Sequence, residues 1–409
     1  MKRRFGLLGR TLGHSFSPEI HAEFGDYDYA LFAVEPEKLE DFLLCGPFDG
    51  VNVTIPYKQA VMPYCIYVDP LAARIGAVNT LLRREDGLYG YNTDYFGFLC
   101  MAQRMGVSFA EKRVLILGSG GTSRTVSTVL EDQGAAAIRI ASRNGPLRYD
   151  ALCACYDFDI IVNTTPVGMY PNNGARVLDL APFRRLSAVL DVIYNPYRTD
   201  LVQQARARAI PASGGLPMLV LQAAAASERF TGIPVPINAR ERALALIRRQ
   251  TRNVVLIGMP GCGKTTIGKA LAGMLARPFF DADAEIEQAA GRSIPAIFQA
   301  EGEAAFRRME RDALRALCKQ SGQVIATGGG AVLDAENREA MRENALVVFI
   351  ERPLAALSME GRPLSQSREA LAAMYAARLP LYQACADIAV SNTDAPQKTA
   401  AEIFDAFQA

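Results

Sequence analysis

The stretch "VVLIGMPGCGKTT", residues 254–266, joins an apolar run to a glycine-rich loop and then to a helical pattern. Gly258, Gly263, Lys264 and Thr265 fit the spacing G-x-x-x-x-G-K-[ST]. In such a loop, backbone N–H groups surround phosphate oxygens, the lysine reaches the terminal phosphates and the hydroxyl binds Mg²⁺. The stretch therefore predicts an α/β domain that binds a nucleoside triphosphate. The residues expected against the phosphates are Gly261, Cys262, Gly263, Lys264, Thr265 and Thr266.

The composition of the 409-residue chain is that of an ordinary globular protein, half apolar and about a fifth charged. This length predicts two or three domains. A net charge of +1 gives no reason to expect a nucleic-acid or membrane partner. The apolar run near the start is broken by Gly9 and Arg10, so it lacks the core of a signal peptide. We expect a cytoplasmic protein with small-molecule partners, whose oligomeric state the sequence leaves open.

Short β-branched runs alternate with helical segments along most of the chain. They lie at residues 114–117, 138–141, 159–163, 188–192, 254–257, 324–326 and 346–350. Apolar strands separated by helices indicate parallel sheets covered on both faces. Just before the strand at Val254, a helix is predicted with Asn238 as N-cap and Glu241 as its capping-box partner. No flexible linker intervenes, and we divide the chain near residue 250.

The residues behind the phosphate loop indicate what accepts the phosphoryl group. Asp281 and Asp283 lie two apart at a strand end, so their carboxylates face one side of the chain. One can hold Mg²⁺ or orient the nucleophile, while the other binds hydroxyls. Arginines at 307, 362 and 378 suit a carboxylate on the acceptor, because a guanidinium binds it bidentately. The three glycines 328–330 allow a ligand to approach the backbone closely.

Together these motifs resemble the shikimate kinase family over residues 252–409. The resemblance implies that Lys264 and Thr265 handle ATP·Mg²⁺, and that Asp281 lies by the metal and the reacting hydroxyl. It implies that shikimate is bound by Asp283, Arg307, Gly329 and Arg378, with both arginines on its carboxylate. Arg362 would belong to the lid over ATP. The lid is short, and Ser358 stands about where the family usually carries another arginine.

A second glycine-rich stretch, "VLILGSGGTSRTV" at residues 114–126, places Gly118, Gly120 and Gly121 between a strand and a helix. Ser123 replaces the usual third Gly/Ala and is small enough for close helix packing. After the next strand, Ser142 and Arg143 stand where a NAD-binding unit carries an acidic residue. A basic residue there favours the 2′-phosphate of NADP. Arg148 fits either an assisting role or a solvated surface charge.

Two polar segments before this unit contain candidate catalytic residues. In "GVNVTIPYK", residues 50–58, apolar and polar residues alternate until Pro56, which ends the predicted strand before Lys58. In "GYNTD", residues 90–94, Asp94 lies in a polar turn before a helix. A lysine and an aspartate brought together can polarise a carbonyl and manage the proton that accompanies hydride transfer. Taken singly, Lys58 also fits a surface lysine and residues 92–94 also fit helix caps.

The order of seven motifs resembles the shikimate dehydrogenase family over residues 1–250: "GRTLGHSFSPEIH", "GVNVTIPYK", "IGAVNTL", "GYNTD", "GSGGTSR", "DVIYNPYRT" and "GGLPMLVLQAA". The resemblance implies that Lys58 is catalytic, with Asp94 as its partner. It implies that shikimate is bound by Ser15, Ser17, Thr54, Asn79, Tyr194 and Gln222, with Asn52 supporting the strand. The implied NADP(H) site is lined by Gly118, Gly120, Gly121, Ser142, Arg143, Val192 and Gly215. His14 and His21 are expected to pack and cap.

The two resemblances imply an α/β protein in which a Rossmann NADP domain, residues 96–215, follows an α/β substrate domain, residues 1–95. A helical return, 216–250, precedes a P-loop kinase domain with a parallel sheet, 251–409. The implied reactions are NADPH-dependent reduction of 3-dehydroshikimate and ATP-dependent phosphorylation of shikimate. Two alternatives are a dehydrogenase that prefers quinate and a metabolite-sensing regulator without turnover. A regulator is expected to lose its catalytic residues, yet Lys58, Asp94, Lys264, Thr265 and Asp281 are all present.

Overall fold

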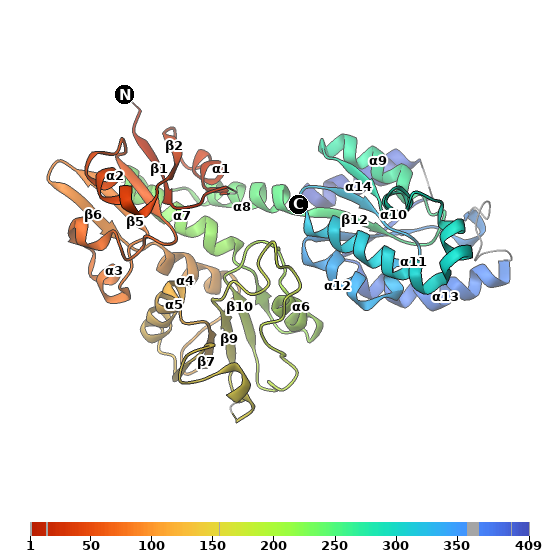
Figure 1. The fold of residues 1–409 in the computed structure, drawn as a ribbon, viewed down its shortest axis with the longest axis horizontal. Coiled ribbons are helices and arrows are strands. Elements are labelled where there is room, and N and C mark those ends of the chain that lie inside the picture. The colour runs from red at the N-terminus through yellow and green to blue at the C-terminus, as the bar shows by residue number, and fades with distance from the viewer. Residues whose placement is uncertain (1, 14, 155, 358–367, 394, 409) are drawn as a thin grey trace. The chain divides into compact units, whose positions relative to one another are not determined.

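The structure, a computed structural model, describes residues 2–13, 15–154, 156–357, 368–393 and 395–408. It divides into two compact units. The first comprises Met1–Val167, Arg176–Tyr194 and Gln204–Ile247, and the second comprises Gly168–Ala175, Asn195–Gln203 and Arg248–Ala409. Both contain sheets with helices on their faces (Figure 1). Within the described ranges, no helix is both long and apolar enough to cross a bilayer. The finer boundaries at residues 95, 215 and 250 stay predictions.

The first unit begins with a six-stranded mixed sheet in the order β2-β1-β3-β5-β6-β4. Its strands are β1 Arg4–Gly9, β2 Asp28–Ala33, β3 Gly50–Val53, β4 Cys65–Val68, β5 Thr80–Arg84 and β6 Gly87–Tyr91. The helices between them are α1 Ser17–Ala22, α2 Leu39–Cys45 and α3 Pro70–Ile75. β1 pairs in parallel with β2 and β3, whereas β5 is antiparallel to β3. The strand β1 therefore separates β2 from β3.

The strand β3 ends earlier than the alternating pattern predicts. We expected Ile55 on its apolar face, but the strand stops at Val53 and Ile55 is 78% exposed. The reason is a turn in which the N–H of Tyr57 donates to the carbonyl of Thr54. This turn takes the chain out of the sheet and leads to Lys58.

The same unit contains a parallel five-stranded sheet in the order β11-β10-β9-β7-β8. Its strands are β7 Arg113–Leu117, β8 Ala137–Ala141, β9 Ile160–Asn163, β10 Ala188–Asp191 and β11 Ala212–Ser213. The associated helices are α4 Asp94–Arg104, α5 Gly121–Asp132 and α7 Leu216–Thr231, while α6 Asp200–Ala207 is assigned to the second unit up to Gln203 and to the first from Gln204. The four apolar runs predicted between residues 114 and 192 are strands of this sheet. Because the strand order reverses beside β7, a crevice for a ligand is expected at its carboxyl end, where Gly118 begins the loop.

The second unit has its own parallel sheet in the order β13-β14-β12-β15-β16. Its strands are β12 Asn253–Ile257, β13 Phe279–Asp281, β14 Val324–Ala326, β15 Ala345–Glu351 and β16 Ile388–Ser391. Its helices are α9 Lys264–Leu275, α10 Ala282–Ala290, α11 Ile294–Lys319, α12 Ala335–Glu343, α13 Arg368–Cys385 and α14 Pro396–Gln408. Figure 1 shows α9 and α14 against one face of this sheet and α11 with α12 against the other. The order reverses beside β12, so the phosphate loop lies at the switch point of the sheet.

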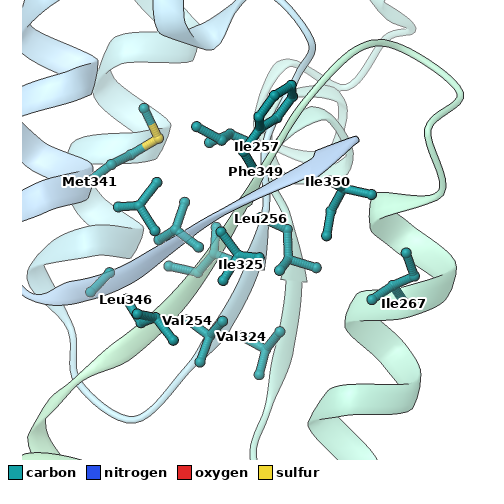
Figure 2. Close-up of a cluster of buried hydrophobic side chains, with 14 of the residues drawn as sticks. Val254, Leu256, Ile257, Ile267, Val324, Ile325, Met341, Leu346, Phe349 and Ile350 are labelled. Atoms are coloured by element: carbon teal, nitrogen blue, oxygen red, sulfur yellow. The ribbon is translucent and has the colours of Figure 1, made fainter. Parts of the chain in front are cut away.

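The central strand β12 is buried along its whole length. Val254 and Leu256 pack with Ile325 of β14 and Phe349 of β15, as Figure 2 shows. Burial of each such side chain contributes about 1.5–3 kcal/mol relative to exposure. The loop that begins at Gly258 therefore starts from a firmly packed strand.

The helix α8, Ile237–Thr251, corrects the predicted capping box. Asn238 lies inside the helix, because the carbonyl of Pro236 accepts from the N–H groups of Ala239 and Arg240. The Glu241 carboxylate forms an ion pair with Arg104 of α4 instead of turning back to the helix start. A tertiary ion pair has thus replaced the local cap.

Candidate active sites

Lys58 and Asp94, which lie 36 residues apart in the sequence, meet in the first unit. The Nζ atom of Lys58 lies 2.6 Å from Oδ2 of Asp94. Lys58 lies in the turn after β3, and Asp94 is the first residue of α4, so a turn and a helix start bring the charges together. An ammonium has three donors, and two remain for a ligand after one has gone to Asp94. The pair is therefore placed to donate a hydrogen bond to a carbonyl oxygen.

The alternative interpretation of residues 92–94 as helix caps holds in part. The Oδ1 atom of Asn92 accepts from the N–H of Tyr95 at 3.3 Å, whereas Thr93 makes no side-chain cap bond to α4. Asp94 is directed to Lys58 instead. The polar turn thus serves both the helix end and the charged pair.

The side chains predicted to bind the substrate come from several elements of the first unit. Ser15 Oγ donates to Ser17 Oγ at 3.1 Å, and the N–H of Thr93 donates to Asn79 Oδ1 at 2.7 Å. Gln222 on α7 accepts from the hydroxyl of Thr93 at 3.5 Å. These groups are uncharged donors and acceptors, as a polyhydroxylated ligand requires.

Tyr194 and Thr54 are the remaining members of the predicted substrate set. The ring of Tyr194 lies edge-on to Phe16, the residue between the two serines, with 6.2 Å between centroids. Thr54 is half-buried, and its N–H donates to the carbonyl of Leu8. Both therefore lie beside the elements that carry the serines and Lys58.

His21 is a packing residue, as predicted, while His14 lies outside the described residues. The ring of His21 stacks on Tyr29 with 4.0 Å between centroids, and its Nδ1 lies 2.8 Å from the hydroxyl of Tyr27. Burial lowers the pKa of His21 to about 3. It is therefore neutral near pH 7 and unsuited to general acid–base catalysis there.

The glycines after β7 have the geometry of a nucleotide-binding turn. Gly118 has φ +103°, a conformation that favours glycine, and a side chain there would meet Thr164 Oγ1 at 2.9 Å. Gly120 precedes α5, and a Cβ added at Gly120 or Gly121 meets no protein atom within 4 Å. The amino end of α5 is thus open to a phosphate group.

The other predicted cofactor residues lie at the carboxyl edge of the same sheet. Ser142 is buried and Arg143 is exposed immediately after β8. Gly215 packs so closely on Val192 that an added Cβ would lie 2.0 Å from its carbonyl oxygen. Arg148 forms an exposed ion pair with Asp150, which favours the surface-charge interpretation. A guanidinium and a helix amino end on one sheet edge fit a phosphorylated dinucleotide.

The phosphate loop of the second unit needs glycine at three positions. Gly258, Gly261 and Gly263 have φ values of +146°, +79° and +100°. Lys264 is buried, and its ammonium donates to the carbonyls of Gly258 and Met259 at 2.9 and 3.0 Å. The lysine is thereby held across its own loop, where phosphate oxygens would be its natural additional partners.

Cys262 and Thr266 complete the predicted phosphate-binding set. Cys262 is buried, and its carbonyl accepts from the amide of Asn392 at 2.7 Å, which braces the loop. Thr266 is exposed on the first turn of α9. The small side chain of Cys262 thus serves packing and leaves the phosphate side to the backbone.

Thr265 and Asp281 fit a divalent cation. The hydroxyl of Thr265 donates to Oδ2 of Asp281 at 2.7 Å, so two hard oxygen ligands lie side by side. Mg²⁺ prefers oxygen ligands and usually takes one or two from the protein and the rest from phosphate and water. Thr265 and Asp281 therefore remain the predicted metal ligands.

A cavity of about 530 Å³ lies beside the loop. All four residues predicted to bind the acceptor line it: Asp283, Arg307, Gly329 and Arg378. Arg378 is buried, and its Nη1 donates to the carbonyl of Gly329 at 3.0 Å. Arg362 lies outside the described residues, as does Ser358.

The sequence reasoning missed Glu310, whose buried carboxylate pairs with Arg307 at 2.8 Å. The available signal was its position three residues after Arg307 on α11, which places both on one helix face. Arg352, Phe298 and Phe306 also line the cavity and were not singled out. The two phenyl rings form an apolar wall of the cavity, which no local sequence motif indicates.

Two carboxylate oxygens in the cavity have no hydrogen-bond partner among the described residues. They are Oδ1 of Asp283 and Oε1 of Glu310. A Cβ added at Gly328 would lie 2.7 and 2.9 Å from them, so both border the same small space. Buried acceptors without donors are costly. The cavity therefore suits a ligand that brings hydroxyl groups as well as a carboxylate.

Burial, reinforced by the charge of Asp281, raises the pKa of Asp283 to about 6. If the second unit phosphorylates a hydroxylated acceptor, as the resemblance implies, we expect its KM for that acceptor to rise several-fold as the pH falls from 7 to 5. Above its pKa the carboxylate of Asp283 is ionised and accepts hydrogen bonds from hydroxyl groups, and below its pKa it is protonated. The carboxylate of the phosphoryl-acceptor molecule, with an ordinary pKa of about 4, stays ionised over this range. Initial rates at saturating ATP check this, and Asp283→Asn should flatten the profile. A wild-type KM that is constant between pH 5 and 7 would contradict it.

Comparison with known proteins gives two matches to sequence models of families. One described as "Shikimate dehydrogenase substrate binding domain" matches residues 7–81, and one described as "Shikimate kinase" matches residues 260–408. Among the relatives is a "Shikimate dehydrogenase (NADP(+))" of Geobacillus sp. (strain WCH70). It is 38% identical over 260 residues, which are 57% of this chain and 94% of that protein.

Solved structures of the first family are also similar to the chain. A chorismate mutase/shikimate 5-dehydrogenase fusion protein from Clostridium acetobutylicum has a TM-score of 0.58 and 35% identity, covering 60% of this chain and 97% of that one. Shikimate 5-dehydrogenase from Thermus thermophilus, in complex with NADP(H) and shikimate, has a TM-score of 0.55 and 32% identity. It covers 59% of this chain and 98% of that one. The chain therefore belongs to the shikimate dehydrogenase family and carries, behind that part, a domain of the shikimate kinase family.

Proposed function

We propose that the chain catalyses two consecutive reactions. The first unit reduces 3-dehydroshikimate to shikimate with NADPH, and the second transfers the γ-phosphoryl group of ATP to the C3 hydroxyl of shikimate. The observation that carries the proposal is the cavity beside the phosphate loop. Arg307, Arg378 and the two unpartnered carboxylate oxygens in this cavity match a hydroxylated carboxylic acid, which is the class of product that the other half would make.

In the dehydrogenase reaction, Ser15 and Ser17 bind the carboxylate of the substrate, and Asn79 and Gln222 bind its ring hydroxyls. Lys58 donates a hydrogen bond to the C3 carbonyl oxygen and delivers a proton to it as the alkoxide forms. Asp94, at 2.6 Å, holds the ammonium in place. NADPH, held by the glycine loop and by Ser142 and Arg143, would supply the hydride.

In the kinase reaction, Arg307 and Arg378 bind the carboxylate of shikimate, and Asp283 accepts from a ring hydroxyl. Asp281 orients the C3 hydroxyl toward the γ-phosphorus. Lys264 contacts the β- and γ-phosphates, where its charge offsets the charge on the transferring group. Mg²⁺, held by Thr265 and Asp281, would neutralise the phosphates.

A coupled assay with the full chain tests the proposal. With 3-dehydroshikimate, NADPH, ATP and Mg²⁺, we expect NADPH loss and ADP formation in a ratio of one to one, with shikimate 3-phosphate as the product. Without ATP the reaction should stop at shikimate. Quinate with NAD is the comparison pair. Quinate carries an additional hydroxyl at C1, and NAD lacks the 2′-phosphate of NADP. Absence of NADPH consumption, or faster turnover of quinate with NAD, would contradict the assignment.

A further inference from the structure

A row of hydrogen bonds crosses the first sheet beneath the predicted substrate side chains. The hydroxyl of Tyr29 on β2 donates to Oδ1 of Asn52 on β3 at 2.8 Å. Nδ2 of Asn52 donates to Thr80 Oγ1 at 3.3 Å, and the hydroxyl of Thr80 donates to Asn79 Oδ1 at 3.1 Å. Tyr29 and Thr80 have no predicted role in the site. They nevertheless join residues that do.

The row continues at both ends into the predicted substrate set. At one end, the side chain of Ser17 hydrogen-bonds to Tyr29, and Ser15 donates to Ser17 at 3.1 Å. At the other end, Nδ2 of Asn79 donates to Thr93 Oγ1 at 3.0 Å, and Thr93 lies 3.5 Å from Oε1 of Gln222. The two serines and the side chains of Asn79 and Gln222 are thereby parts of one connected row of hydrogen bonds.

From Tyr29 through Asn52 to Thr80, the donors of the row point the same way. Burial raises the pKa of Tyr29 well above its ordinary value, which keeps its hydroxyl a donor. Asn52 must then present its oxygen to Tyr29 and its NH₂ group to Thr80. Thr80, having accepted from Asn52, has one proton to give, and its acceptors are Asn79 Oδ1 at 3.1 Å and Thr93 Oγ1 at 3.3 Å. The bond from Thr80 adds to the one that Asn79 Oδ1 accepts from the N–H of Thr93 at 2.7 Å, and it depends on the hydroxyl of Tyr29 on β2, three strands from β5.

The sheet order explains why a tyrosine occupies position 29. β1 lies between β2 and β3, and neighbouring strands are about 4.8 Å apart, so the side chains of Tyr29 and Asn52 together must bridge roughly 10 Å. Tyr29 is the register partner of Phe5, and Asn52 is the partner of Leu7, two residues along the same strand. The four side chains lie on one face. His21, stacked on the ring of Tyr29, holds it in this course.

We propose that Tyr29 and Thr80 are positioning residues that, through Asn52, supply one of the hydrogen bonds holding the Asn79 amide in the orientation with which it meets the substrate. The inference rests on the proposed dehydrogenase function and adds residues to its site. Removal of the Tyr29 hydroxyl leaves Asn52 Oδ1 without its donor. The amide can then turn and take the proton of Thr80, and Asn79 loses that bond.

The test is a double-mutant cycle in the full chain with Tyr29→Phe and Thr80→Val, assayed as shikimate oxidation with NADP. Each single variant should raise KM for shikimate about five- to tenfold, the value of one buried hydrogen bond, with kcat within about twofold. KM for NADP should stay unchanged, because its predicted residues lie on the other sheet. The KM of the double variant for shikimate should equal that of the single variant with the higher KM, rather than show the product of both increases.

Two controls separate positioning from stability. Thr80→Ser retains the hydroxyl and should keep the wild-type KM. Tyr89→Phe removes a hydroxyl that bonds to Asp86 at 2.8 Å and is not part of the row. It should change neither the KM nor the kcat for shikimate. A lowered melting temperature in Tyr29→Phe with an unchanged KM, or multiplicative effects in the double variant, would overturn the inference alone. Absence of activity in the unaltered chain would overturn the proposed function and the inference together.

Discussion

Replacement of Lys58 by alanine is expected to lower kcat for ketone reduction by about a thousandfold. The reason is its position, with Nζ at 2.6 Å from Asp94 and two further N–H donors for the carbonyl oxygen. A positioned acid–base group contributes about 10²- to 10⁴-fold to the rate. Steady-state rates with 3-dehydroshikimate and NADPH measure the loss. The ATP-dependent step, supplied directly with shikimate, should keep its wild-type rate in the same preparation.

The matched control for Lys58 is Lys38→Ala, which removes an exposed lysine of the same sheet domain. It should leave both activities unchanged. The kcat of Asp94→Asn for ketone reduction should lie between those of the wild type and Lys58→Ala, because the ammonium remains but loses its charged partner. Dehydrogenase turnover that survives in Lys58→Ala would show that the assigned proton donor is wrong.

The sheets could be predicted because central parallel strands have a strong local signature. The run at residues 254–257 is buried in the structure and leads directly into the loop at Gly258. The phosphate loop was within reach for a related reason, because its chemistry needs particular residue types at fixed distances from a strand end. The pairing of Lys58 with Asp94 was implied by the family resemblance, since sequence spacing alone does not show that two residues 36 apart meet.

The rest depends on which elements become neighbours. Tyr29 joins the site only because β1 separates β2 from β3, and nothing near residue 29 indicates that order. Glu310 lies on a polar helix face that resembles solvated surface until the cavity is known. The predicted cap at Asn238 was wrong because the carboxylate of Glu241 forms an ion pair with Arg104, 137 residues away in sequence. Local rules fail where a distant partner competes for the same side chain.

The two sites also differ in how they would hold the same carboxylate. The first offers serine hydroxyls, and the second offers Arg307 and Arg378 beside Glu310. Charge-assisted hydrogen bonds are roughly twice as strong as neutral ones. A partly buried arginine needs compensation when no ligand is present, and the Glu310 carboxylate at 2.8 Å supplies it for Arg307. Loss of Arg307 should therefore remove the ion-pair partner of the Glu310 carboxylate as well.

Replacement of Lys264 by methionine is expected to lower kcat of the phosphoryl transfer about a thousandfold and to leave the dehydrogenase rate unchanged. The methionine keeps an unbranched stem in the buried position but removes the charge that would face the transferring group. It also removes the bonds to the carbonyls of Gly258 and Met259, so thermal unfolding must be followed in parallel. ADP release with shikimate and ATP·Mg²⁺ measures the effect.

The control for Lys264 is Lys269→Met, which makes the same chemical change at an exposed position of α9. Because this lysine lies more than a turn beyond the loop, both activities should be retained. If Lys264→Met kept kcat and raised only the KM for ATP, the ammonium would stabilise bound ATP and the transition state equally. The assignment to the transferring phosphoryl group would then be wrong, since a charge that acts on the reaction itself must be felt more strongly in the transition state than in the bound substrate.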